Sequence, residues 1–122
     1  MPPRIEVKKQ ADVTLVLCQD ALLNDELAIQ EWGDQLMSIV ENGTCQKLVL
    51  NFEKVRLMSS SALRILIMLQ KKTDAGEIPF ILCGLRDEIL EVFKITNLDT
   101  LFNIRKGPEE AIRSFPYLGE KI

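Results

Sequence analysis

The sequence predicts an α/β protein whose central β-sheet is mostly parallel and is flanked by α-helices. Apolar segments of strand length alternate with segments of helical periodicity over most of the chain. Such alternation implies right-handed crossovers, which join parallel strands. Two strand-like segments also follow each other directly at the start, so we expect a mixed sheet with one antiparallel hairpin. At 122 residues, the chain is expected to form a single domain over residues 1–122.

The opening hairpin is predicted from alternation. Ile5 and Val7 alternate with charged residues, which indicates a short strand with one solvent-exposed face. Residues 13–18 predict a second strand that is apolar on both faces. Residues 10–12 lie between them and are expected to make a tight reversal.

A helix and a buried strand follow the hairpin. Asn24 or Asp25 is expected to cap the helix. Its apolar stripe has helical spacing and consists of Trp32, Leu36, Ile39 and Val40. Asn42 and Gly43 form a natural C-terminal cap. Residues 48–52 are apolar except for Asn51, as expected for a strand that is covered on both faces.

The second half continues the alternation. A second helix is predicted after residues 59–61 and ends near Gly76, and Pro79 starts a strand over residues 80–83. The apolar face of a third helix, which ends near Asn97, consists of Ile89, Leu90, Val92 and Phe93. Residues 101–104 predict a short last strand, and Pro108 opens a final helix. The predicted order is β-β-α-β-α-β-α-β-α.

Composition excludes several classes of function. Eighteen acidic and fifteen basic residues give a net charge of −3, without the clustered Lys and Arg that nucleic acids or anionic membranes require. The chain has no histidine, which removes Ser-His-Asp and Cys-His catalysis and His-ligated zinc. It also lacks the glycine-rich phosphate-binding motifs of nucleotide-binding enzymes. We therefore expect no enzymatic activity, no metal and no cofactor.

The three cysteines are far apart, and Cys18 and Cys83 lie within apolar runs. They are expected to be buried free thiols in a reducing compartment. The N-terminus has no apolar signal-peptide stretch. The longest unbroken apolar run covers residues 65–69, far short of a membrane span. A cytoplasmic location, away from any membrane, is therefore expected.

The loop that ends in Ser59, Ser60 and Ser61 carries the strongest functional signal. It follows a buried strand of the predicted sheet and opens a helix, where exposed amides favour an anion. Two alternatives stay open on the residues alone: the serines cap the helix, or one of them accepts a phosphate. A nucleophilic serine is not expected, because no base is available to it.

Two further features flank the serines. Arg56 and Arg64 are either solvated charges or contacts for an acidic partner or a bound phosphate. The helix over residues 62–70 carries more apolar surface than one core-facing stripe buries. That helix either lies between other elements or exposes a patch for a partner.

The loop and the order of elements resemble the STAS domain of bacterial anti-sigma-factor antagonists. That family has an apolar strand ending in Asp-Leu-Ser, a short loop, and then Asp-Ser-Ser-Gly-Leu at the start of a helix. Here residues 48–53 read Leu-Val-Leu-Asn-Phe-Glu and residues 58–63 read Met-Ser-Ser-Ser-Ala-Leu. Downstream, Gly84-Leu85, residues 92–104 and residues 109–112 are similar to further family segments. The chain departs from the pattern at Asn51, Ser59, Ala62 and Asn97, where the family has Asp, Asp, Gly and Gly.

The resemblance implies a STAS-like fold and a regulatory function without catalysis. It implies that Ser60 is phosphorylated, with Ser59 and Ser61 as alternatives, by a partner that is both an anti-sigma factor and a serine kinase. It also implies a phosphatase that resets the switch. The implied contact surface consists of Ser59, Ser60, Ser61, Ala62, Arg64 and Arg56. The alternative is a STAS scaffold or transporter-associated subunit that has lost the switch, and a homodimer is left open.

Overall fold

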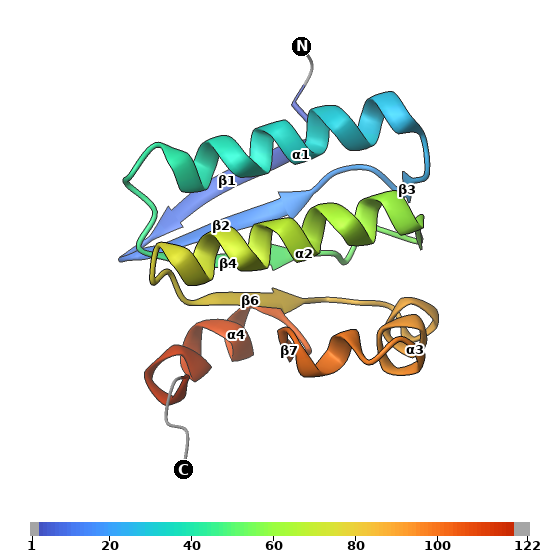
Figure 1. Cartoon of the computed structure of the whole chain (residues 1–122). Helices are drawn as coiled ribbons and strands as arrows, with labels where there is room; N and C mark the ends of the chain where they lie inside the picture. Colours follow the sequence, from blue (N-terminus) through green and yellow to red (C-terminus); the bar gives the residue numbers. More distant parts are fainter. Residues whose placement is uncertain (1–2, 119–122) are drawn as a thin grey trace.

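The chain folds around a five-stranded β-sheet of order β1-β2-β4-β6-β7, in a computed structural model that describes residues 3–118 (Figure 1). Only the hairpin pair β1–β2 is antiparallel, and the other three pairs are parallel. The predicted α/β class with a mostly parallel sheet is therefore confirmed. The strands span β1 Ile5–Gln10, β2 Val13–Cys18, β4 Lys47–Asn51, β6 Phe80–Cys83 and β7 Asn103–Arg105.

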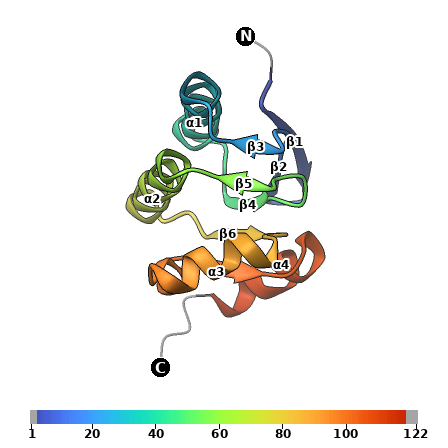
Figure 2. The ribbon, with the colours of Figure 1, turned by 90° about the vertical axis from the view of Figure 1, so that its right-hand side faces the viewer.

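Helices cover both faces of this sheet. Figure 2 shows α1 and α2 together on one side and α4 on the other. The helices span α1 Glu26–Glu41, α2 Ser60–Ala75, α3 Asp87–Ile95 and α4 Pro108–Ser114. Apolar side chains of α1, α2 and α3 share one core with the strands, while α4 closes a smaller cluster on the opposite face. Among residues 3–118, no helix has the length and apolarity that a bilayer crossing needs.

Most sequence-predicted elements are present, with shifted ends. The strand expected at residues 101–104 begins only at Asn103, because a 3-10 turn over Leu98–Thr100 precedes it. Phe102 is 6% exposed and packs with its ring centroid 5.7 Å from that of Phe93. Burial of that ring fixes the segment before pairing starts. The second helix begins at Ser60, two residues earlier than its apolar run.

A second, two-stranded sheet was not predicted. It consists of β3 (Leu22–Leu23) and β5 (Leu57–Met58), which pair in parallel. Two residues are too few for an alternation pattern to be visible in a sequence. This small sheet directly precedes both α1 and α2, so it sets where the two helices start.

The helix α2 packs against α1 and the central sheet. Leu66 and Leu69 are fully buried, and most other apolar side chains of the helix pack partly against the core. A Cβ atom built on Gly33 of α1 would lie 3.0 Å from Cδ1 of Ile65, so the two helices approach closely there. The surplus apolar surface of α2 is therefore mostly used in packing, and Met68, at 50% exposure, is its clearest exposed remainder.

Candidate functional site

The serine loop starts from a tight junction at the end of β4. The side-chain oxygen of Asn51 accepts a hydrogen bond of 3.1 Å from the amide of Glu53. The amide of Phe52 donates to the carbonyl oxygen of Cys83 at 2.9 Å. Gly84 has a φ of +72°, and a Cβ there would stand 2.5 Å from Oδ1 of Asn51. Only glycine therefore allows the two strand ends to approach this closely.

The small sheet then carries the chain to the serines. The amides of Arg56 and Leu57 both donate to the carbonyl oxygen of Ala21, at 2.7 and 3.3 Å. The amide of Ser59 donates to the carbonyl oxygen of Leu23 at 2.8 Å. Backbone bonds to the segment before α1 therefore fix the start of α2.

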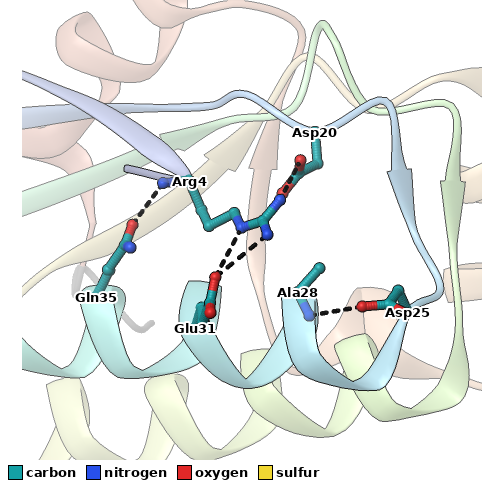
Figure 3. Close-up of polar contacts among 6 residues, drawn as sticks. All are labelled: Arg4, Asp20, Asp25, Ala28, Glu31 and Gln35. Carbon is teal, nitrogen blue, oxygen red and sulfur yellow. Dashed lines mark hydrogen bonds and ion pairs between the residues drawn. The ribbon is translucent and has the colours of Figure 1, made fainter. Parts of the chain in front are cut away.

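An ion-pair cluster around Arg4 stabilises the segment before α1 (Figure 3). The guanidinium group of Arg4 lies 3.1 Å from a carboxylate oxygen of Asp20 and 3.2 Å from one of Glu31. These contacts, led by the hydrogen bond to Glu31, raise the pKa of Arg4 despite some desolvation. The carbonyl oxygen of Arg4 also accepts from the amide of Gln19. The loop that presents the Ala21 carbonyl is thus tied to both β1 and α1.

The three serines have three different environments. Ser59 is the N-cap of α2, and its Oγ accepts from the amide of Ala62 at 3.4 Å. Ser61 is half-buried, and its Oγ donates to Oε1 of Glu26 at 3.1 Å. Ser60 is exposed, and its hydroxyl makes no hydrogen bond with any residue in the range 3–118. Of the three hydroxyls, that of Ser60 is the most accessible to a modifying enzyme.

The surroundings of Ser60 suit an anion. Ser60 is the first residue of α2, where backbone amides lack intrahelical acceptors and the helix dipole is positive. Arg64 lies one turn further along the same helix face, with Cβ atoms about 5–6 Å apart at that spacing. It is exposed and forms no ion pair with any described residue. A phosphate on Ser60 would find both a helix N-terminus and a guanidinium group within reach.

An apolar cavity lies beside the loop. Its volume is about 180 Å³, and it opens between β5, the first turns of α2, and α3. Arg56 and Glu88 are its two charged lining residues. The apolar ones are Leu57, Met58, Leu63, Ile89 and Val92. Arg56 therefore lies at the edge of this cavity, three residues before Ser59. The paired residues Leu22 and Leu57 of the small sheet are 53% and 46% exposed.

One expected contact residue is not at the surface. Ala62 is fully buried, and its methyl group belongs to the main core. The helix phase explains this correction, because residue 62 faces the sheet whereas residues 60 and 64 face solvent. The change from the family glycine to Ala62 therefore affects internal packing rather than the face open to a partner.

Glu26 is the residue at this site that sequence reasoning missed. It is the first residue of α1, which Asp25 caps through a 2.9 Å bond to the amide of Ala28 (Figure 3). The cap was visible in the sequence, and it placed an acidic residue in the first turn. The contact between residues 26 and 61 depends on the unpredicted pairing of β3 with β5, so no local pattern indicated it.

The chain is similar to known proteins in both sequence and fold. Residues 4–111 match the model of the family described as "STAS domain". BtrV of Bordetella bronchiseptica, assigned as a candidate anti-sigma factor antagonist, is 25% identical over 104 residues. That alignment covers 85% of this chain and 88% of BtrV.

Two solved structures share the fold at lower identity. A candidate anti-sigma factor antagonist of Thermotoga maritima superimposes with a TM-score of 0.80 at 18% identity. It covers 92% of this chain and 94% of its own. The Bacillus cell fate determinant SpoIIAA in its phosphorylated form superimposes with a TM-score of 0.69 at 18% identity. It covers 89% of this chain and 96% of its own. The arrangement of sheet and helices is thus shared with both of these proteins.

Proposed function

Because this chain belongs to the STAS domain family, we propose that it is an anti-sigma factor antagonist that is switched by phosphorylation of Ser60. The partner is an anti-sigma factor that is also a serine kinase, and a phosphatase reverses the modification. Support comes from the match of residues 4–111, from the similarity to BtrV, and from the exposed serine at the start of α2.

The observation that carries this proposal is the difference among the three hydroxyls. Ser59 is occupied as a cap and Ser61 as a donor to Glu26, whereas the Ser60 hydroxyl is exposed. In the reaction, Oγ of Ser60 forms a bond to the γ-phosphorus of ATP, the bond to ADP breaks, and the hydroxyl proton passes to a base of the kinase. This chain supplies only the acceptor oxygen, which suits a protein without histidine.

The switch acts through charge at an interface. The unmodified surface presents the serines beside exposed Leu22 and Leu57, which a partner can cover at little desolvation cost. A phosphate adds about −1.5 to −2 charges to a chain whose net charge is −3. Those charges would have to be desolvated in the complex, so the modified chain releases the partner.

Affinity capture with the immobilised chain tests the proposal. We expect wild-type chain to retain a serine kinase from an extract of the source cells, and addition of Mg-ATP to phosphorylate the chain once and elute the kinase. Ser60→Ala should also retain the kinase, but it should not accept phosphate, and Mg-ATP should not elute the kinase from it. Ser60→Asp should bind the kinase at least about tenfold more weakly, because a charge enters the interface.

The matched control is Ser114→Ala. Ser114 lies on α4, on the opposite face of the sheet. This variant should be phosphorylated and should bind the kinase like the wild type. Phosphate that appears equally on the wild type and on Ser60→Ala would remove Ser60 from the mechanism. Stable binding that is identical for the wild type and Ser60→Asp, with no phosphorylation, would instead identify a scaffold without a switch.

A further inference from the structure

The N-termini of α1 and α2 lie side by side, and one hydrogen bond joins their side chains. Both helices follow directly from the paired strands β3 and β5 and run in the same direction (Figure 1). Glu26 is the first residue of α1, and its Oε1 lies 3.1 Å from Oγ of Ser61, the second residue of α2. A carboxylate therefore stands beside one of the three serines and holds its hydroxyl.

We propose that Glu26 is a specificity-determining residue that prevents phosphorylation of Ser61 and so confines modification to Ser60. This inference rests on the proposed function, because it concerns which serine of that site the kinase modifies. Nothing in the family motif carries it: residue 26 lies outside both motif segments, and the contact spans 35 positions of the sequence.

The first reason is the direction of the Ser61 hydroxyl. A kinase needs the serine hydroxyl to turn its proton toward the kinase's base and a lone pair toward the γ-phosphorus. The hydroxyl proton of Ser61 is instead directed at the Glu26 carboxylate. Transfer to Ser61 therefore first requires loss of a charge-assisted hydrogen bond, whereas the exposed hydroxyl of Ser60 is not held in this way.

The second reason is electrostatic. A phosphate on Ser61 would place about two negative charges against the Glu26 carboxylate, and like charges at hydrogen-bond distance repel. At Ser60 the nearest charged residue on the same face of α2 is Arg64, one turn away, which attracts a phosphate. Glu26 and Arg64 together bias the site toward the first residue of the helix.

Site-resolved mass spectrometry of the chain after reaction with its kinase and Mg-ATP tests this assignment. In the Ser60→Ala background, phosphate on Ser61 should stay at a trace occupancy while Glu26 is present. Glu26→Ala in that background should raise phosphorylation of Ser61 by roughly 3- to 10-fold, since it removes both the acceptor and the charge. Glu26→Gln keeps an acceptor without the charge and should give an intermediate increase.

Asp34→Ala is the matched control. It removes one exposed acid from the same helix, eight residues and about 12 Å further along its axis, and should leave the occupancy of Ser61 as low as in the Ser60→Ala parent. Equal Ser61 occupancy with and without Glu26 would overturn the inference while leaving Ser60 as the modified residue. Absence of any phosphate on wild-type chain would overturn the proposed function itself, which makes the two failures distinguishable.

A thermal double-mutant cycle tests the same contact without a kinase. Ser61→Asp places a carboxylate where the phosphate would stand. The Tm change caused by Glu26→Gln should therefore be about 2 to 4 °C more positive in that variant than in the wild type. The parallel cycle with Ser60→Asp should show a smaller coupling. A coupling of zero between residues 26 and 61 would contradict the electrostatic basis of the inference.

Discussion

The amide of Ser59 donates to the carbonyl oxygen of Leu23 across 2.8 Å, and this bond joins the last residue before α2 to the end of β3. It places the helix N-cap against the segment that leads into α1. Ser59 holds the position twice, since its side chain also caps the amide of Ala62 at 3.4 Å. The residue directly before Ser60 is therefore fixed through both its backbone and its side chain.

Ser59→Ala should lower the free energy of unfolding by about 0.5–1 kcal/mol, because it leaves the Ala62 amide without its cap. Ser59→Asp should stay close to the wild type, since aspartate caps equally well and its charge suits the helix dipole. Urea unfolding followed by circular dichroism measures both. Equal loss for the two variants would show that the side-chain cap contributes nothing.

Ser59→Asp also recreates the acid that the family motif has at this position. The wild-type Ser59 caps the helix without a charge, whereas the aspartate of the variant caps it with one. Comparing the two therefore separates the effect of the charge from that of the cap. The kinase should be assayed on Ser59→Asp and on the wild type. If the two proteins have the same free energy of unfolding, a difference in phosphorylation rate measures the effect of the charge at residue 59 alone.

The junction behind the loop should be intolerant of any side chain at Gly84. Gly84→Ala combines a positive φ with a Cβ 2.5 Å from Oδ1 of Asn51, and should cost about 2–4 kcal/mol of stability. Gly43→Ala is the matched control, because Gly43 has a φ of +80° but no atom within 4 Å of the added Cβ. Its cost should be about 1 kcal/mol, the strain alone. Similar losses at both positions would mean that the close approach to Asn51 is relieved without cost.

Sequence patterns correctly predicted the features of the fold that depend on interactions between residues close together in the chain. The stripe containing Trp32 and Leu36 produced a buried helix face, and an Asp25 cap follows from the preference of aspartate for that position. Pro108 likewise opens α4 at its first position. Helix caps and apolar stripes depend on residues within a few positions of one another, so they can be predicted from the sequence alone.

The candidate site was predictable only in part, because its geometry depends on distant residues. The serines and their place at a helix start were visible in sequence. The pairing of Leu22 with Leu57 was not, since each strand has two residues. The contact of Glu26 with Ser61 follows from that pairing and was equally hidden. Burial of Ala62 depends on which face α2 turns to the sheet, and its nearly uniform apolar sequence did not indicate that face.

Loss of the Arg4 guanidinium should loosen the loop before β3 while leaving the core intact. Arg4→Ala removes the bonds to Asp20 and Glu31 that fix the segment carrying the Ala21 carbonyl. Hydrogen exchange should become faster at the amides of Arg56, Leu57 and Ser59, which bond to this segment and its continuation. Arg113→Ala, an exposed arginine of α4, is the control and should leave these amides unchanged. Unaltered exchange in the Arg4 variant would mean that the small sheet holds without this cluster.

Alkaline pH should destabilise the chain through its buried thiols. Burial raises the pKa of Cys18 and of Cys83 to about 12, from an ordinary value of 9.0 that applies once the chain unfolds. Between about pH 9 and 12 the unfolded chain therefore loses thiol protons that the folded chain keeps, so the free energy of unfolding falls as pH rises. Each thiol contributes up to about 1.4 kcal/mol per pH unit to that slope.

Cys18→Ala isolates this contribution. The substitution creates a packing loss that does not depend on pH, but it should flatten the decline of stability between pH 9 and 11 relative to the wild type. Chemical denaturation at several pH values measures the slope, and iodoacetamide labelling at pH 8 provides a second readout. Because the native thiols stay protonated and buried, alkylation should occur only as fast as the chain unfolds. Rapid labelling of the folded wild type would contradict the raised pKa of these thiols.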